Sequence, residues 1–211
     1  MKRFLQVFLL LISTVLLFSC SSTKQLTKAS PKESIFVATP PLATHYSTAL
    51  YKAKINIADK KYSGLFYFKL MEDTSYRVVL LSEFGLNLLD LEYKNHDFTV
   101  VNCKSFLDKS IIVNTLKKDL KLLLDFPESK TKIVYDNNYQ SVKRIDKRRC
   151  FEKISCFYNE NQVLKNILRK KGFSHIDITT TYLDKKIPSR IHIKNKRIKL
   201  DFELNLIKIE K

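Results

Sequence analysis

Apolar and polar residues alternate along much of the chain from Tyr46 onward. In residues 51–57, every second residue is apolar, and the intervening residues are Lys or Asn. This period of two is typical of a strand with one buried face. Similar segments follow at short intervals, separated by turn-forming residues, and predict further strands at 63–70, 75–81, 86–93 and 97–102. The short intervals favour hairpins, so we expect an antiparallel sheet.

The period then becomes that of a helix in residues 110–124. Lys residues occupy the other faces of this segment, and Pro127 ends it because proline cannot continue a helix. The apolar positions are spaced by three or four residues: Ile112, Leu116, Leu120, Leu123 and Leu124. The sequence predicts one amphipathic helix here and no other convincing helix in the folded part.

Strand patterns resume after the helix. We expect about six further strands, with candidates at 132–135, 141–145, 151–158, 164–169, 174–182, 189–193 and 197–209. One segment is ambiguous, because Val163, Leu164, Ile167 and Leu168 also fit a helical stripe over 161–171. The pattern alone leaves a strand and a helix open there.

The order of these elements predicts the fold class. Five strands, one helix and then more strands must cover one apolar sheet face, and a curved sheet wrapped around a helix does so. We therefore expect a mainly β protein with a plugging helix, arranged as an antiparallel open half-barrel.

The N-terminus has a different pattern. Lys2 and Arg3 precede a mostly apolar run over residues 4–18, which is shorter than the roughly 20 residues of a membrane-spanning helix. A positive start, a short apolar run and small residues at its end indicate a secretory signal peptide at 1–19. Residues 17–20, Leu-Phe-Ser-Cys, resemble the lipobox of bacterial lipoproteins. The alternative is an ordinary signal peptide with a chance cysteine.

The lipobox implies a covalent lipid on Cys20, and we expect no cofactor besides this lipid. Each buried methylene contributes about 0.8 kcal/mol, so two or three acyl chains anchor a protein firmly. Ser21, rather than Asp, follows the cysteine, which in many diderm bacteria implies the outer membrane, here at its periplasmic face. Residues 20–45 are rich in Ser, Thr, Lys and Pro and predict a flexible tether. Residues 46–211 form the predicted folded domain.

Three stretches resemble the LolB family of outer-membrane lipoprotein receptors, and more distantly its soluble partner LolA. The first is residues 76–85, a strand running into an apolar-glycine loop. The second is the strand at 98–102 with the helix that ends before Pro127. The third is residues 187–193 followed by 197–200. The resemblance covers about residues 46–211.

This resemblance implies an open antiparallel barrel whose apolar cavity takes up acyl chains. Its partners would be lipoproteins, a LolA-type carrier and the membrane surface, and we expect a monomer that binds no nucleic acid. The candidate cavity walls are Phe66, Phe68, Val78, Leu80, Leu89, Leu91, Ile112, Leu116 and Leu120. The alternative is that these residues form an ordinary packed core.

The resemblance also implies a membrane-inserting loop. Phe84, before Gly85, matches the loop position at which LolB proteins carry an apolar residue, and Leu86 is a second candidate. An apolar side chain at a loop tip can enter the membrane interface. The alternative is that Phe84 packs on the core. The chain departs from the family in having no Trp, which puts the shape of the cavity in doubt.

The chain is strongly basic, with a formal net charge of +17. An exported protein meets little nucleic acid, so anionic lipid headgroups or an acidic protein are the more accessible partners. The basic residues cluster at Lys143, Arg144, Lys147, Arg148 and Arg149, and at Arg169, Lys170 and Lys171. The alternative is a solvated surface that only maintains solubility.

Catalytic and metal-binding patterns are missing from the sequence. The four histidines have no ligand spacing, there is no Gly-x-Ser-x-Gly elbow, and the three glycines form no phosphate loop. We therefore expect a binding protein rather than an enzyme. Cys103, Cys150 and Cys156 remain after Cys20, and Cys150 and Cys156 fit a disulfide only if a turn lies within 151–155.

The sequence thus predicts an outer-membrane lipoprotein that binds acyl chains and receives and inserts other lipoproteins. The alternative from another class is an envelope lipoprotein that uses the same fold, with a filled core, to bind a protein partner.

Overall fold

The computed structural model describes residues 39–42, 46–57, 60–104, 110–126, 130–136, 142–149, 151–159, 161, 163–184 and 187–210. The predicted signal peptide, Cys20 and the predicted tether up to residue 38 lie outside these ranges, as does Cys150.

Twelve strands and one helix make up the described fold. The strands are β1 (Thr48–Ile57), β2 (Lys60–Leu70), β3 (Tyr76–Ser82), β4 (Asn87–Lys94), β5 (Asp97–Cys103), β6 (Lys130–Asp136), β7 (Val142–Arg149), β8 (Glu152–Tyr158), β9 (Leu164–Lys171), β10 (Ser174–Tyr182), β11 (Pro188–Asn195) and β12 (Leu200–Glu210). The helix is α2 (Ser110–Leu124).

All strands belong to one antiparallel sheet in the order β5-β4-β3-β2-β1-β12-β11-β10-β9-β8-β7-β6. The chain builds outward from β1 to the edge strand β5, crosses through α2 to the other edge at β6, and returns strand by strand until β12 pairs with β1. The ends of the sheet, β5 and β6, are not paired with each other. The predicted mainly β, antiparallel and open arrangement with one helix is confirmed.

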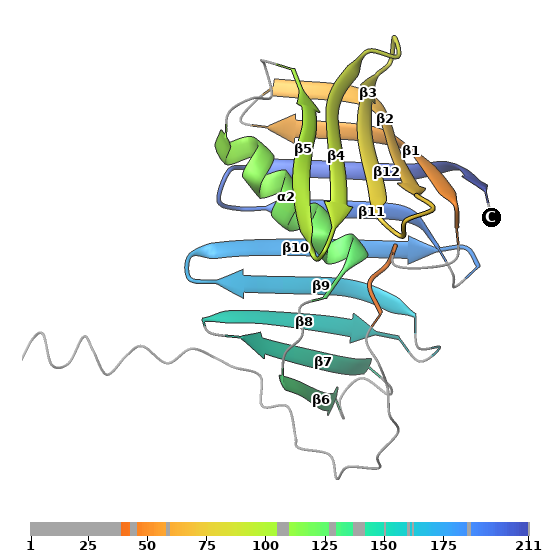
Figure 1. Ribbon diagram of the computed structural model, residues 1–211. Coiled ribbons are helices and arrows are strands. Elements are labelled where there is room, and N and C mark those ends of the chain that lie inside the picture. Colours follow the sequence, from red (N-terminus) through yellow and green to blue (C-terminus); the bar gives the residue numbers. More distant parts are fainter. Residues whose placement is uncertain are drawn as a thin grey trace, which may run out of the picture.

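The sheet is folded over on itself. Figure 1 shows that β3, β4 and β5 cross in front of β12, β11 and β10, with α2 between these two parts. The core is continuous through the helix and both parts of the sheet. Along β1, the buried residues Tyr51, Ala53 and Ile55 alternate with exposed Lys52 and Lys54, as the period of two requires.

Gly64 marks a place where β3 approaches β2 closely. A Cβ atom on Gly64 would lie 2.0 Å from the carbonyl oxygen of Leu81, which is less than any contact distance. In the register of the sheet, Gly64 pairs with Ser82 at the end of β3. A glycine is therefore required where the two backbones come together.

Three details differ from the sequence predictions. The helix considered for 161–171 is wrong, because residues 164–171 form β9, which pairs with β8 and β10. The last strand begins at Leu200 rather than at residue 197, because 196–199 form a four-residue turn. Leu42, placed in the tether by the prediction, has 0% exposure and belongs to the core.

Candidate functional site

Helix α2 is enclosed on more than one side. Its buried residues span a little over half of the helix circumference: Val113, Leu116, Asp119, Leu120, Leu122, Leu123 and Leu124. An amphipathic surface helix buries only one stripe. The broader burial follows from the position of α2 between the two parts of the folded sheet (Figure 1). This position matches the predicted plug.

The nine predicted cavity residues all come together in the cluster around α2. Eight have exposures between 0% and 2%, and Ile112 is partly buried against the same cluster. At 0% exposure, a water-sized sphere touches none of the surface of Phe66, Phe68 or Leu120. In this conformation these side chains are packed together as core.

A buried polar pair joins α2 to β11. Asn195 Nδ2 donates to both carboxylate oxygens of Asp119, at 3.0 and 3.3 Å, and the two residues are 3% and 1% exposed. Burial raises the pKa of Asp119 to about 7, although the hydrogen bond from Asn195 and the charges of Arg169 and Lys118 favour the ionised form. The sequence did not identify this pair.

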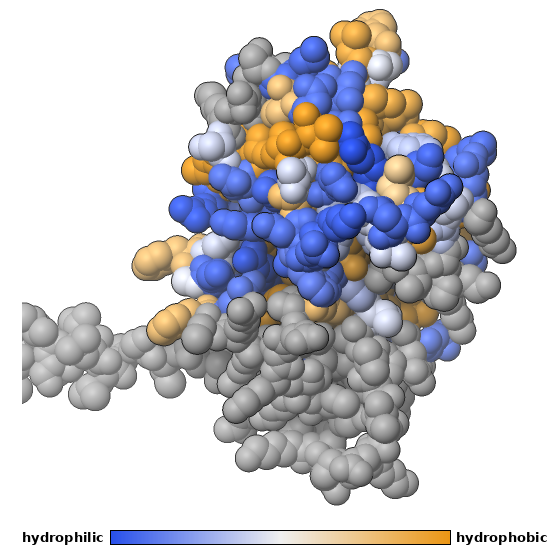
Figure 2. Space-filling view, viewed as in Figure 1, coloured by the Kyte–Doolittle hydropathy of each residue, from blue (hydrophilic) through white to orange (hydrophobic). Residues whose placement is uncertain are grey.

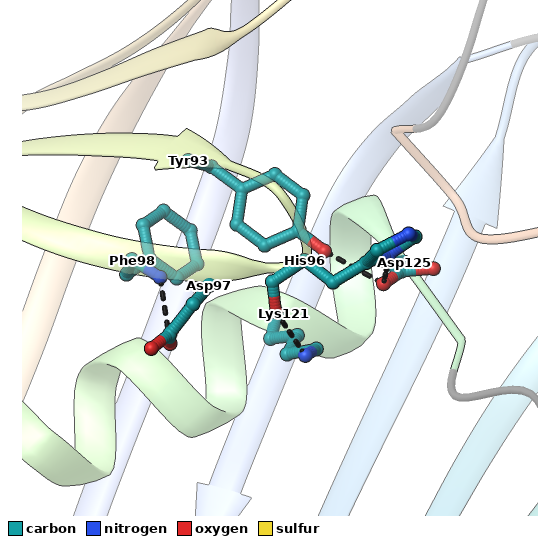
Figure 3. A network of polar contacts seen from close by, with 6 residues as sticks. All are labelled: Tyr93, His96, Asp97, Phe98, Lys121 and Asp125. Atoms are coloured by element: carbon teal, nitrogen blue, oxygen red, sulfur yellow. Dashed lines mark hydrogen bonds and ion pairs between the residues drawn. The ribbon is translucent and has the colours of Figure 1, made fainter.

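The end of α2 is held by the turn between β4 and β5, as Figure 3 shows. Asp125 Oδ2 accepts a hydrogen bond of 2.6 Å from the Tyr93 hydroxyl and lies 2.9 Å from His96 Nδ1. Lys121 donates to the carbonyl oxygen of His96. Burial, and then the hydrogen bond to Asp125, raise the pKa of Tyr93 far above its usual value. These contacts fasten α2 to the β3–β5 part of the sheet.

Residues 39–42 hold the same end of the helix. The backbone N–H of Leu42 donates to the carbonyl oxygen of Leu123 at 2.7 Å. The Tyr46 hydroxyl donates to the carbonyl oxygen of Leu42 at 3.0 Å. The last carbonyls of a helix have no partner within the helix, so Leu42 satisfies one of them. Displacing α2 would break this bond as well.

A polar pocket of about 430 Å³ opens beside this helix end. It is lined by Asp73, Thr74, Ser75, Tyr76, Tyr93, Lys94, Asn95, His96, Leu124 and Asp125. Asp73 accepts hydrogen bonds from Lys94 and Ser75, both at 2.6 Å, which hold the pKa of Asp73 well below its usual range. Ser75 therefore points at a carboxylate and not at His96, which engages Asp125 instead.

The predicted membrane loop lies at the tip of the β3–β4 hairpin. Phe84 is 92% exposed and Leu86 is 63% exposed. Gly85 adopts a φ of 78°, and its N–H donates to the carbonyl oxygen of Ser82 at 3.0 Å, which closes the turn. The alternative that Phe84 packs on the core is wrong. Figure 2 shows apolar surface where this hairpin projects at the top of the view.

The described residues bear on the expected disulfide, on metal binding and on membrane-spanning helices. Cys156 lies in the middle of strand β8, whereas Cys150 lies outside the described residues, so the disulfide considered for this pair stays a prediction. The described residues contain no group of three His, Cys, Asp or Glu that could hold a metal ion. Within the described ranges, no helix has the length and apolar character to cross a membrane.

The sequence prediction missed a second set of exposed apolar residues. Phe151, Phe173 and Leu183 are 97%, 106% and 89% exposed at hairpin ends. One residue separates Phe151 and Phe173 from the basic runs that precede them, and those runs were considered in the sequence only for their charge. The side chains of the predicted cluster at Arg148 and Arg149 lie outside the described residues.

Comparisons with known proteins give little further guidance. No protein-family model matches the chain, and no curated protein matches it. Among solved structures, the chain is similar to a DUF1329 family protein from Desulfovibrio piger, with 10% identity and a TM-score of 0.30. The match covers 78% of this chain and 85% of that chain. None of these comparisons assigns the chain to the LolB family.

Proposed function

We propose that this protein is a lipid-anchored envelope protein that receives lipoproteins and delivers them to the outer membrane, as LolB-like proteins do. The observation that carries the proposal is the β3–β4 hairpin. Its tip exposes Phe84 and Leu86, while Val78, Leu80 and Leu89 on its strands belong to the core around α2. The same hairpin therefore links an exposed apolar tip to the apolar interior.

In this proposal, acyl chains bind beneath α2. The helix moves away from the folded sheet, and the apolar side chains that it covered contact the acyl chains instead. The acyl chains are removed from water both in the protein interior and in the bilayer. The free energy of transfer is therefore only the small difference between two apolar environments. No residue needs to perform covalent chemistry, and no energy source is needed at this step.

Opening requires that α2 loses defined contacts. These are the hydrogen bonds of Asp119 to Asn195, of Tyr93 to Asp125, and of Leu42 to Leu123. Each neutral hydrogen bond contributes about 0.5–1.5 kcal/mol and those to charged groups about 1.5–3 kcal/mol, so the polar part of the opening cost is a few kcal/mol. Bound acyl chains would offset this cost through their own burial.

The filled core favours a second candidate function. Because the predicted cavity walls are packed against each other, the domain also suits an envelope lipoprotein that binds a protein partner through its surface. In that case α2 would be a permanent part of the core. The two candidates differ in whether the interior ever takes up lipid.

A transfer assay tests the proposal. The chain from residue 20 onward, with Cys20→Ala to prevent lipidation, contains all the described residues. It is mixed with a LolA-type carrier that is loaded with a tagged lipoprotein, and the tag is followed by size-exclusion chromatography. Movement of the tag to this protein supports the acceptor function. A tag that stays on a carrier from the same organism, shown to be active with another acceptor, contradicts it and favours the partner-binding function.

A further inference from the structure

Three hairpin turns lie side by side at one end of the sheet. Arg149 pairs with Glu152 across the β7–β8 turn, and Lys171 pairs with Ser174 across the β9–β10 turn. Glu152 also pairs with Lys171, which places these two turns next to each other, about 10 Å apart at two strand spacings. The β11–β12 turn follows, because the N–H of Lys196 donates to the carbonyl oxygen of His175. We call these turns the 151/173/197 edge.

Two aromatic rings project from this edge. Phe151 is 97% exposed and Phe173 is 106% exposed, so both side chains project into solvent with almost no contact with the rest of the protein. Figure 2 shows two apolar projections at the left of the view, where Figure 1 places the β7–β8 and β9–β10 turns. Single exposed apolar residues are common on protein surfaces. Two fully exposed Phe side chains on neighbouring turns are less common, and they lie close enough together to contact the same binding partner.

The backbone conformation of Phe151 is unfavourable for a bulky side chain. Phe151 has a φ of 54°, in the left-handed region that a bulky side chain rarely adopts. In the next turn, the equivalent position is Phe173, and the positive φ of 54° falls one residue earlier, at Gly172. A Gly or Asn would suit position 151 better in the isolated protein. An exposed Phe in a strained position contributes nothing to the described core, so a contact outside this chain is the better explanation.

The edge is also strongly basic. Residues 170–175 and 194–199 contain Lys170, Lys171, Lys194, Lys196, Arg197 and Lys199 and no Asp or Glu. The five of these cations other than Lys194 lie in or beside the turns, and all six are exposed. The carboxylate of Glu152, at the start of β8, is already engaged by Arg169 and lies 3.6 Å from Lys171. The cations therefore outnumber the carboxylates at the edge.

The positive potential also acts on a neighbouring side chain. Burial lowers the pKa of His175 below its usual value, and the charges of Lys196 and Lys170 lower it further, while Asp177 opposes them. Lys170 and Lys196 belong to two different hairpins, so their charges act on the same small region. This agrees with the placement of the three turns side by side.

We propose that the 151/173/197 edge is a docking surface for a bilayer that contains anionic lipid. Phe151 and Phe173 enter the interface between headgroups and acyl chains, and the surrounding Lys and Arg contact the anionic headgroups. Exposed aromatic rings framed by cations are complementary to such a surface in both polarity and charge. A protein partner would need a surface of complementary shape, and two projecting rings do not form a pocket that would hold one.

This inference is independent of the proposed lipoprotein transfer. The edge lies at a different end of the molecule from the β3–β4 hairpin tip (Figure 1), so the two surfaces meet a bilayer in different orientations. Docking through the edge would hold the domain against the membrane whether or not α2 releases acyl chains. The transfer assay can therefore fail while docking is retained, and the reverse also holds.

Vesicle flotation tests the docking surface. The chain from residue 20 with Cys20→Ala is mixed with vesicles of phosphatidylcholine alone, or of phosphatidylcholine with one quarter phosphatidylglycerol. We expect binding to the anionic vesicles that weakens at high salt. Phe151→Asn with Phe173→Asn should weaken it at least about tenfold. Lys170→Glu with Lys196→Glu should also weaken it at least about tenfold, since each cation near the surface contributes about fivefold.

Leu183→Asn is the matched control. Leu183 is 89% exposed at the β10–β11 loop, at the opposite end of the strands, so it tests exposed apolar area without the edge. Its vesicle binding should equal that of the parent protein. All variants should unfold at the same temperature as the parent or higher, because the replaced side chains are exposed and Asn tolerates the φ of position 151.

Two outcomes would overturn the proposal. The first is a parent protein that floats equally with both vesicle types or with neither. The second is a folded Phe151→Asn, Phe173→Asn variant that binds anionic vesicles as the parent does. Loss of binding in the Leu183→Asn control would show that general surface hydrophobicity, not the edge, drives binding, and would also overturn it.

Discussion

The Asp119 carboxylate on α2 lies 3.0 Å from the side-chain amide of Asn195 on β11, inside the core. The pair joins the plugging helix to the β10–β12 part of the sheet, while Asp125 and Tyr93 join its end to the β3–β5 part. The helix is thus held from both sides by polar contacts, one buried in the core and the other at its partly exposed end. The contact between Asp119 and Asn195 depends on pH, because the pKa of Asp119 is raised to about 7.

We predict that the free energy of unfolding falls as the pH rises from about 4 to about 7. Burial raises the folded pKa of Asp119 from 3.8 to about 7, so in this window the folded state holds more protons than the unfolded state. Between pH 5 and pH 8 the loss should be about 2–3 kcal/mol relative to Asp119→Asn, which cannot ionise. Urea unfolding of both proteins at the two pH values measures it. Parallel pH dependence of the two proteins would contradict the assignment.

Residues 39–42 belong to the fold, and we predict a large effect of Leu42→Ala. Leu42 has 0% exposure, so the substitution leaves a cavity beside α2 and should lower the free energy of unfolding by about 2–5 kcal/mol. Chemical denaturation measures the change. The control is Leu183→Ala at an 89% exposed position, which should shift it by less than about 0.5 kcal/mol. Equal effects of the two substitutions would show that Leu42 is not part of the core.

Gly64→Ala should destabilise the domain by about 1–3 kcal/mol or more. The added Cβ would lie 2.0 Å from the carbonyl oxygen of Leu81, and only movement of the β2 or β3 backbone can relieve this contact. Ser63→Ala, one residue away at an exposed position, is the matched control and should have little effect. Thermal unfolding followed by circular dichroism compares the two. A Gly64→Ala protein as stable as the control would contradict the close approach of the strands.

Much of the fold follows from local patterns. The helix over 110–124 has the bounds expected from its period of three to four and from Pro127. The alternating segments became strands because a period of two fits only a half-buried strand. The segment 161–171 was ambiguous because its four apolar residues fit a helical stripe, whereas the turn-forming residues 170–172 favoured a hairpin. The segment forms a strand because it pairs with β8 on one side and β10 on the other.

The contacts of the candidate site could not be predicted in the same way. Asp119 and Asn195 are 76 positions apart, and their pairing depends on how the sheet folds over α2, which no local pattern encodes. Leu42 lies next to Pro40 and Pro41 in a polar segment, so its composition indicated a tether. Phe151 and Phe173 share a signal in the sequence, an aromatic residue one position beyond a basic run and a single intervening residue, but their exposure depends on where the turns lie.

The β3–β4 hairpin tip provides the most direct test of membrane delivery. Phe84 is 92% exposed, so Phe84→Glu removes little packing and should change the free energy of unfolding by less than about 0.5 kcal/mol. We expect the variant to accept a lipoprotein from the carrier as the parent does, because the residues around α2 are unchanged. Delivery to vesicles should fall at least about tenfold, since a charged side chain at the tip opposes entry into the interface.

The measurement follows a tagged lipoprotein from the carrier to this protein and then to floated vesicles, so that uptake and delivery are separate readings. Leu183→Glu places the same charge at another exposed apolar position and should deliver as the parent does. A Phe84→Glu protein that delivers at the parental rate would remove the hairpin tip from the mechanism. A variant that fails already at uptake would instead place Phe84 in the contact with the carrier, because the loss would then precede any encounter with the bilayer.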